Sequence, residues 1–169
     1  MYYYDESPQP VMAIGRRETK KIDEALAHLK EIPNLEQLYI NDTKVTDVGL
    51  VHLKRLGTLK TLCLNNTDIT DAGLAHLSGL TNLSRLYLQK TRVTDAGMIH
   101  LKGMTKLRRL DLSNTIVTDS ELTRLRRLRD LRALGIGSTQ ISSAGLRYVK
   151  GLLPGCRLFY TLTPSGPVR

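Results

Sequence analysis

Residues 35–58 read LEQLYINDTKVTDVGLVHLKRLGT, and this 24-residue pattern returns four more times without a gap. The later copies begin at Leu59, Leu83, Leu107 and Leu131, so the five units fill residues 35–154. Their common pattern is LxxLxLxxTx(V/I)TDxGLxxLxxLxx. A fixed period of this length indicates units that stack in one direction, because a single unit cannot bury its apolar face alone.

Each unit predicts a strand followed by a short helix. In LEQLYI the apolar residues Leu38 and Ile40 alternate with polar ones, which is the pattern of a strand. The apolar spacing then becomes three, at Leu50, Leu53 and Leu56, which suits one face of a short α- or 3₁₀-helix. Stacked units of this kind place the strands side by side in one parallel sheet.

The TD pairs predict where each helix begins. Thr46 stands at the expected N-cap, and the carboxylate of Asp47 follows in the first turn, where it favours the positive end of the helix dipole. The same pairs recur at residues 70–71, 94–95 and 118–119, and capping is taken to account fully for the four Asp residues. Thr118 and Glu121 also predict a capping box.

These motifs resemble the leucine-rich repeat, with Thr43 and its equivalents where the usual pattern has Asn or Cys. The TDxGL segment is most similar to repeats of bacterial proteins, and more distantly to the substrate-binding repeats of F-box proteins. The resemblance covers residues 11–163. It implies an α/β solenoid with a curved parallel β-sheet on the concave face and short helices on the convex face. It also implies a non-catalytic interaction module that binds a protein or peptide on the concave sheet.

Weaker copies of the pattern flank the five units. Residues 11–34 are predicted to be a degenerate N-terminal capping repeat, with Ile14 and Asp23 in register with the later units, and residues 155–169 a partial C-terminal repeat and tail. Residues 1–10, MYYYDESPQP, are predicted to be an N-terminal tail, and they lack the basic and apolar regions of a secretory signal. No apolar run is long enough to cross a membrane. We therefore expect a cytoplasmic protein that does not enter a membrane.

The candidate binding residues lie between the inward-pointing leucines. Gln37, Tyr39, Asn41 and their equivalents are expected to point out of the concave face. Tyr and Arg are the residue types that most often carry binding energy at interfaces. The predicted partner-binding residues are Tyr39, Asn65, Arg85, Tyr87, Gln89, Arg109 and Asp111, with Asp111 as a charged discriminator. Gly135 and Gly137 suggest a bound segment across the third to fifth units, although drift toward the end of the repeats explains them equally well.

The net charge of +9 is unevenly distributed. Residues 1–82 hold nine Lys and Arg against eleven Asp and Glu, whereas residues 83–169 hold sixteen against five. Arg124, Arg126, Arg127, Arg129 and Arg132 form a predicted basic patch. The alternative function is therefore an anion-directed binder of nucleic acid or of an acidic protein. Nucleic acid is the less favoured partner, because no recognised nucleic-acid motif accompanies the charge. The basic patch is also explained as a solvated edge of the molecule that binds no partner.

The remaining reactive residues give no catalytic pattern. His28, His52, His76 and His100 share one position of the repeat, which duplication explains, so no metal site is predicted. Cys63 is expected to be an exposed free thiol, about 19 Å from Cys156 and thus too far for a disulfide. No nucleotide, hydrolase or zinc-protease motif is present. The sequence predicts no enzyme, no cofactor and no small-molecule substrate.

Overall fold

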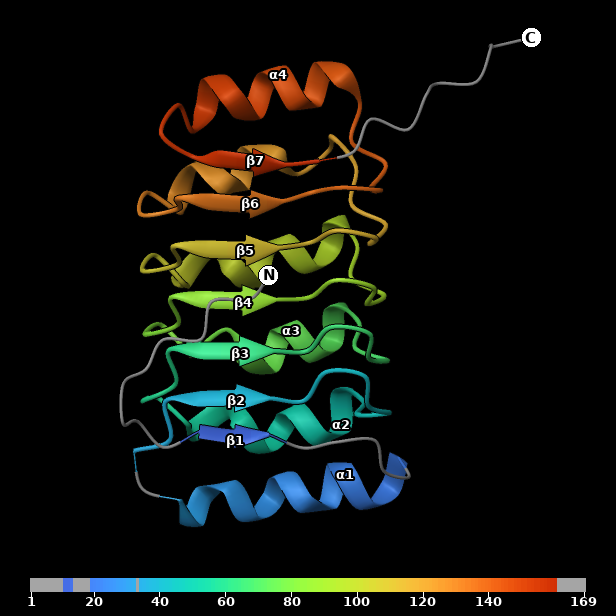
Figure 1. Ribbon diagram of the computed structural model, residues 1–169, viewed down its shortest axis with the longest axis vertical. Helices are drawn as coiled ribbons and strands as arrows, with labels where there is room; N and C mark the ends of the chain where they lie inside the picture. The colour runs from blue at the N-terminus through green and yellow to red at the C-terminus, as the bar shows by residue number, and fades with distance from the viewer. Residues whose placement is uncertain (1–10, 14–18, 33, 161–169) are drawn as a thin grey trace, which may run out of the picture.

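The computed structural model describes residues 11–13, 19–32 and 34–160. Its strands stack in chain order as one seven-stranded parallel sheet, and its helices lie on one side of that sheet (Figure 1). We call the side of the sheet away from the helices the concave face. The strands are β1 (Val11–Ala13), β2 (Gln37–Tyr39), β3 (Thr61–Cys63), β4 (Arg85–Tyr87), β5 (Arg109–Asp111), β6 (Ala133–Gly135) and β7 (Arg157–Phe159).

The helices are short and mix α and 3₁₀ geometry, as the three-residue apolar spacing predicts. The α-helices are α1 (Thr19–Leu26), α2 (Asp47–Leu50), α3 (Asp71–Leu77) and α4 (Ser143–Leu152). The 3₁₀-helices are η1 (Ala27–Glu31), η2 (Val51–Arg55), η3 (Asp95–Gly103) and η4 (Leu122–Arg127). Residues 1–10 and 161–169, which hold the predicted tails, lie outside the described residues.

The strand register follows the 24-residue period from β2 onward. Leu38 pairs with Leu62, and the pairing continues through Leu86, Leu110, Leu134 and Leu158. The first strand departs from the period. Met12 pairs with Leu38, so β1 lies two residues earlier than the expected register of Ile14, which itself falls outside the described residues. The chain from Ala13 to Asp23 is therefore two residues longer than the equivalent stretch from Tyr39 to Asp47.

One continuous apolar core fills the space between the sheet and the helices. It extends from Ile22 to Leu153 and consists mainly of leucines with almost no exposed surface. The repeat's Thr at the end of each strand is also buried. The Thr43 hydroxyl donates to the Ile40 carbonyl at 2.9 Å, and Thr67, Thr91 and Thr115 make the same contact in their own units. Each hydroxyl thereby satisfies a backbone oxygen inside the core.

The predicted N-caps are confirmed for Thr46, Thr70 and Thr94 but wrong for Thr118, because η4 begins only at Leu122. The hydroxyl oxygen of Thr46 accepts a hydrogen bond from the amide two residues on, and Thr70, Thr94 and Thr118 do the same. The purely capping role of the Asp residues is wrong. The Asp47 carboxylate accepts from the backbone amide and the hydroxyl of Thr70, at 2.8 and 2.6 Å, in the next unit. We call these cross-unit contacts the Asp–Thr ladder; its pairs are Asp23–Thr46, Asp47–Thr70, Asp71–Thr94, Asp95–Thr118 and Asp119–Ser142.

The ladder explains the Gly of the TDxGL motif. A Cβ atom built on Gly73 would collide with the Asp47 carboxylate of the preceding unit, and equivalent collisions occur at Gly49, Gly97 and Gly145. The fourth unit carries Glu121 at this position. Its helix, η4, begins only at Leu122, whereas the equivalent helices begin at the Asp of the motif.

The predicted capping box of the fourth unit is also wrong. The Thr118 amide already donates to Asp95 at 2.9 Å, so it has no proton left for the Glu121 carboxylate. Glu121 instead pairs with Arg124. The sequence signal for a capping box is therefore overridden by a contact that only stacking creates.

Candidate functional site

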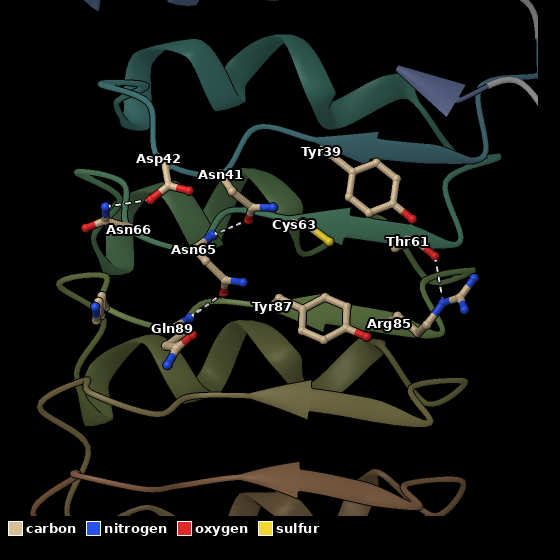
Figure 2. Close-up of a pocket in the computed structure, with 11 residues that line it drawn as sticks. Tyr39, Asn41, Asp42, Thr61, Cys63, Asn65, Asn66, Arg85, Tyr87 and Gln89 are labelled. Atoms are coloured by element: carbon tan, nitrogen blue, oxygen red, sulfur yellow. Dashed lines mark hydrogen bonds between the residues drawn. The ribbon is translucent and has the colours of Figure 1, made fainter. Parts of the chain in front are cut away.

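A hollow of about 300 Å³ lies on the concave face over β2, β3 and β4 (Figure 2). Five of the seven predicted binding residues line it: Tyr39, Asn65, Arg85, Tyr87 and Gln89. The other lining residues are Asn41, Asp42, Thr61, Cys63, Asn66 and Lys90. We call this site the concave hollow. The bound segment predicted across the third to fifth units would lie over β4, β5 and β6, so it would cross the concave hollow only at β4.

Cys63 lies at the centre of the concave hollow, between two tyrosines. It pairs with Tyr39 on one side and with Tyr87 on the other, and Figure 2 shows the sulfur between the two rings. Its exposed fraction is only 4%. The expectation of an exposed thiol is wrong, because Tyr39 and Tyr87 on the adjacent strands are much larger than Cys and cover it.

Burial raises the pKa of the Cys63 thiol to about 12, and the positive charge of Arg85 offsets part of that rise. Cys63 is therefore a neutral thiol at physiological pH. Burial also raises the pKa of Cys156, and both cysteines are free, as their predicted separation requires.

The first outward-pointing residues of β2 and β3 are more buried than their position predicts. Gln37 and Thr61 are 7% and 2% exposed, because larger neighbours cover them. The Tyr39 hydroxyl donates to Gln37 Oε1 at 2.8 Å, and Arg85 Nε donates to Thr61 Oγ1 at 2.9 Å. These contacts hold the tyrosine ring and the guanidinium group in place at the start of the strands.

A row of side-chain amides borders the other end of the concave hollow. Asn41 Oδ1 accepts from the backbone amide of Asn65 at 2.9 Å, and Asn65 Oδ1 accepts from that of Gln89 at 2.8 Å. In a side-chain amide only the oxygen accepts a hydrogen bond, so the atom that accepts a backbone N–H is Oδ1 and the other is Nδ2. In Figure 2 both Nδ2 atoms point toward the middle of the hollow.

Arg109 and Asp111 lie on β5, beside the concave hollow. Arg109 Nη1 is 3.5 Å from the Tyr87 hydroxyl, to which it donates. Asp111 Oδ1 accepts from the Ser113 amide at 2.9 Å, and its carboxylate occupies the space that a Cβ on Gly135 would need. Gly135 therefore makes room for Asp111, which explains its presence without a bound segment.

The predicted basic patch lies where η4 ends and the chain turns toward β6. Arg124 is paired with Glu121, whereas Arg126, Arg127, Arg129 and Arg132 are exposed and form no ion pair with any described residue. We call these four residues the arginine edge. Arg126 and Arg129 line two hollows, of about 710 and 330 Å³. The larger also contains Lys102 and Arg127, and the smaller contains Arg132 and several apolar residues.

The His residues do not form a ligand set. His28 lies 3.5 Å from Glu31, and within the described ranges no three His, Cys, Asp or Glu side chains come together as metal ligands would. In the same ranges, no helix combines the length and the apolar character needed to span a membrane.

Solved structures with the same architecture are leucine-rich-repeat proteins. An internalin C2 from Listeria monocytogenes has 27% sequence identity and a TM-score of 0.62, over 86% of this chain and 66% of that one. An internalin (inlF) from the same species has 23% identity and a TM-score of 0.61, over 80% of this chain and 38% of that one. A leucine-rich-repeat protein from Leptospira interrogans has 23% identity and a TM-score of 0.63, over 78% and 33%.

The chain therefore has the leucine-rich-repeat solenoid fold that the motifs predict. It spans only about a third of the length of the inlF and Leptospira proteins. No protein-family model and no curated protein sequence matches it. The finer resemblances, to TDxGL-type bacterial repeats and to F-box proteins, stay predictions.

Proposed function

We propose that this chain is a protein-interaction module that holds a short peptide segment of a partner protein in the concave hollow. The observation that carries this proposal is that two tyrosine rings share the hollow with donor groups that are not fully used. These donors are the Nδ2 groups of Asn41 and Asn65 and the Nη groups of Arg85. Tyr39 and Tyr87 present their rings on the open side of the sheet in Figure 2. Rings of this kind supply large contact area at low entropic cost, and tyrosine is enriched among residues that dominate binding energy.

The size of the concave hollow supports a peptide rather than a whole folded surface. A volume of about 300 Å³ is at the lower end of ligand sites, so it accommodates only a few side chains. The rest of the partner would then rest on the neighbouring strands, where Arg109 and Asp111 extend the same face.

The central thiol supports binding rather than catalysis. A cysteine nucleophile reacts as the thiolate, which requires a lowered pKa. Burial moves the pKa of Cys63 in the opposite direction, to about 12. Because Cys63 and Cys156 are both free, we place the module in a reducing compartment.

Selection of peptides on the immobilised full chain tests this proposal. Clones from a random peptide library are recovered, and their affinity is measured for the wild type and for Tyr39→Ala/Tyr87→Ala. Loss of both rings should weaken binding at least about tenfold, since such residues contribute a large share of binding energy. Tyr148→Ala, which removes an exposed ring on α4, is the matched control. Undiminished binding by the double variant would refute the site.

The second candidate function is anion-directed binding on the arginine edge. It is favoured by one observation: four exposed arginines lie together without an ion pair to any described residue. Guanidinium groups so arranged suit carboxylate or phosphate partners. An acidic protein segment fits this edge better than nucleic acid, because the smaller hollow adds Leu152 and Pro154 rather than an aromatic stacking surface.

A further inference from the structure

The concave hollow offers many more hydrogen-bond donors than acceptors to its occupant. We infer that it recognises an acidic peptide segment, with a carboxylate on Arg85, an apolar side chain over the tyrosine rings, and main-chain carbonyls on Asn41 and Asn65. This inference rests on the proposed function and specifies the chemistry of the partner. It follows from where each polar atom of the hollow is already committed.

The Nδ2 groups of the amide row are directed into the hollow as donors. The Oδ1 atoms of Asn41 and Asn65 are used by backbone amides of the next strand, at 2.9 and 2.8 Å. Each Nδ2 group therefore faces the hollow with protons that it donates to no described residue. A carbonyl or carboxylate oxygen complements such a group, whereas a second donor would leave both unpaired.

Arg85 provides the charge at the opposite end. Its Nε donates to the buried Thr61 hydroxyl, which fixes the plane of the guanidinium group. Its two Nη groups make no hydrogen bond with any described residue. A fixed guanidinium with both terminal nitrogens available suits a carboxylate, which it can bind through two parallel bonds.

The acid that lines the hollow does not neutralise it. Asp42 is the one carboxylate among the described lining residues, and its Oδ1 accepts from Asn66 Nδ2 at 2.8 Å. The cations Arg85 and Lys90 outnumber it. The local field therefore favours an anionic occupant.

The middle of the hollow is apolar. The buried thiol of Cys63 and the rings of Tyr39 and Tyr87 separate Arg85 from the amide row. Arg85 and Gln89 are four residues apart, which is about 13 Å in extended chain at about 3.3 Å per residue. An extended segment of about four residues thus reaches from the guanidinium group to the amides.

A one-atom substitution tests the inference. In Asn65→Asp, the carboxylate still accepts the Gln89 amide, but the free donor becomes a charged acceptor. Peptides selected on the wild type should be enriched in Asp and Glu, and this variant should bind them at least tenfold more weakly. Asn114→Asp is the control, because it adds the same charge. Asn114 occupies the turn position that holds Asp42 in the first full unit, so this position tolerates an Asp. It lies outside the lining of the concave hollow.

A second measurement does not depend on the variant. In ¹⁵N–¹H spectra of the full chain, N-acetyl-phenylalanine should shift the Nε–H signal of Arg85. The uncharged N-acetyl-phenylalaninamide should shift it much less. Equal shifts with both probes, or with neither, overturn the inference.

The acidic partner and the peptide site can be refuted separately. If peptides bind and Tyr39→Ala/Tyr87→Ala abolishes binding, but Asn65→Asp does not weaken it, the acidic partner is wrong and the concave hollow stands. If binding ignores the tyrosines, the proposed function fails as well.

Discussion

The carboxylate of Asp47 accepts hydrogen bonds from both the amide and the hydroxyl of Thr70, which lies one unit further along the chain. The same carboxylate occupies the space next to Gly73. One acidic side chain therefore contacts the N-cap of the next helix and excludes any side chain larger than hydrogen at Gly73 in its first turn.

Substitution of Asp47 and Gly73 should show this coupling in equilibrium unfolding. Asp47→Ala leaves two donors of Thr70 without their partner and should cost about 2–3 kcal/mol. Gly73→Ala should be destabilising because its Cβ meets the carboxylate. Because removing the carboxylate frees that space, the double variant should cost less than the sum of the single variants. Strict additivity in urea titrations would contradict the shared contact.

Glu121→Gly should let the fourth helix begin earlier. Without the Glu121 side chain, the backbone can form the first turn at Asp119, as it does at Asp71 in α3. Cα chemical shifts of residues 119–121 report this directly. The reciprocal change, Gly73→Glu, should delay the start of α3. Unchanged shifts in both variants would mean that another feature sets the start of η4.

Cys63 should make stability depend on alkaline pH. Its pKa is raised in the folded chain to about 12, so the stabilisation is complete below the ordinary thiol pKa and is lost as pH rises toward 12. Between pH 8 and 10 the wild type should lose about 2 kcal/mol more than Cys63→Ala, because the unfolded thiol ionises near 8.5. Parallel unfolding curves for the two proteins across this range would contradict the burial of the thiol.

Alkylation should separate the two cysteines. Cys156 is partly exposed, so iodoacetamide should modify it before Cys63 in the native chain. In Tyr39→Ala/Tyr87→Ala the modification of Cys63 should accelerate, because the flanking rings are gone. Mass spectrometry of digests at timed intervals measures both rates. A Cys63 rate that the double variant leaves unchanged would show that other groups protect it.

The arginine edge should contribute a salt-sensitive part of polyanion binding. Arg126→Glu/Arg127→Glu should weaken binding of polyglutamate at low salt at least tenfold, and wild-type binding should weaken steeply as salt rises. Lys54→Glu/Arg55→Glu is the control, since these exposed residues occupy the same repeat positions three units earlier. Equal effects of the two variants would indicate a response to net charge alone. Tighter binding of an oligothymidylate than of polyglutamate would favour nucleic acid over an acidic segment.

The repeat pattern was sufficient to predict the fold, because the positions of Leu38 and its equivalents determine both strand spacing and core. The two-residue offset of β1 was not predictable, since the length of a connection does not alter the apolar spacing on either side. The Asp–Thr ladder joins residues 23 apart, so it becomes visible only after the units are stacked. Sequence alone ranked the tyrosines as binding candidates but missed that they bury Cys63. The sequence could have indicated this burial, because Tyr39 and Tyr87 occupy the same position of the repeat as Cys63 in the units on either side.

The Asp–Thr ladder also defines where the chain can be shortened. Removal of residues 71–94 would join Thr70 to Asp95, and every remaining carboxylate would still find a hydroxyl partner in the adjoining turn. That shorter molecule would lack Arg85, Tyr87 and Gln89 while keeping an unbroken stack. Excision of whole periods thus offers a way to delete the concave hollow without dismantling the scaffold, which point substitutions in a conventional globular domain seldom permit.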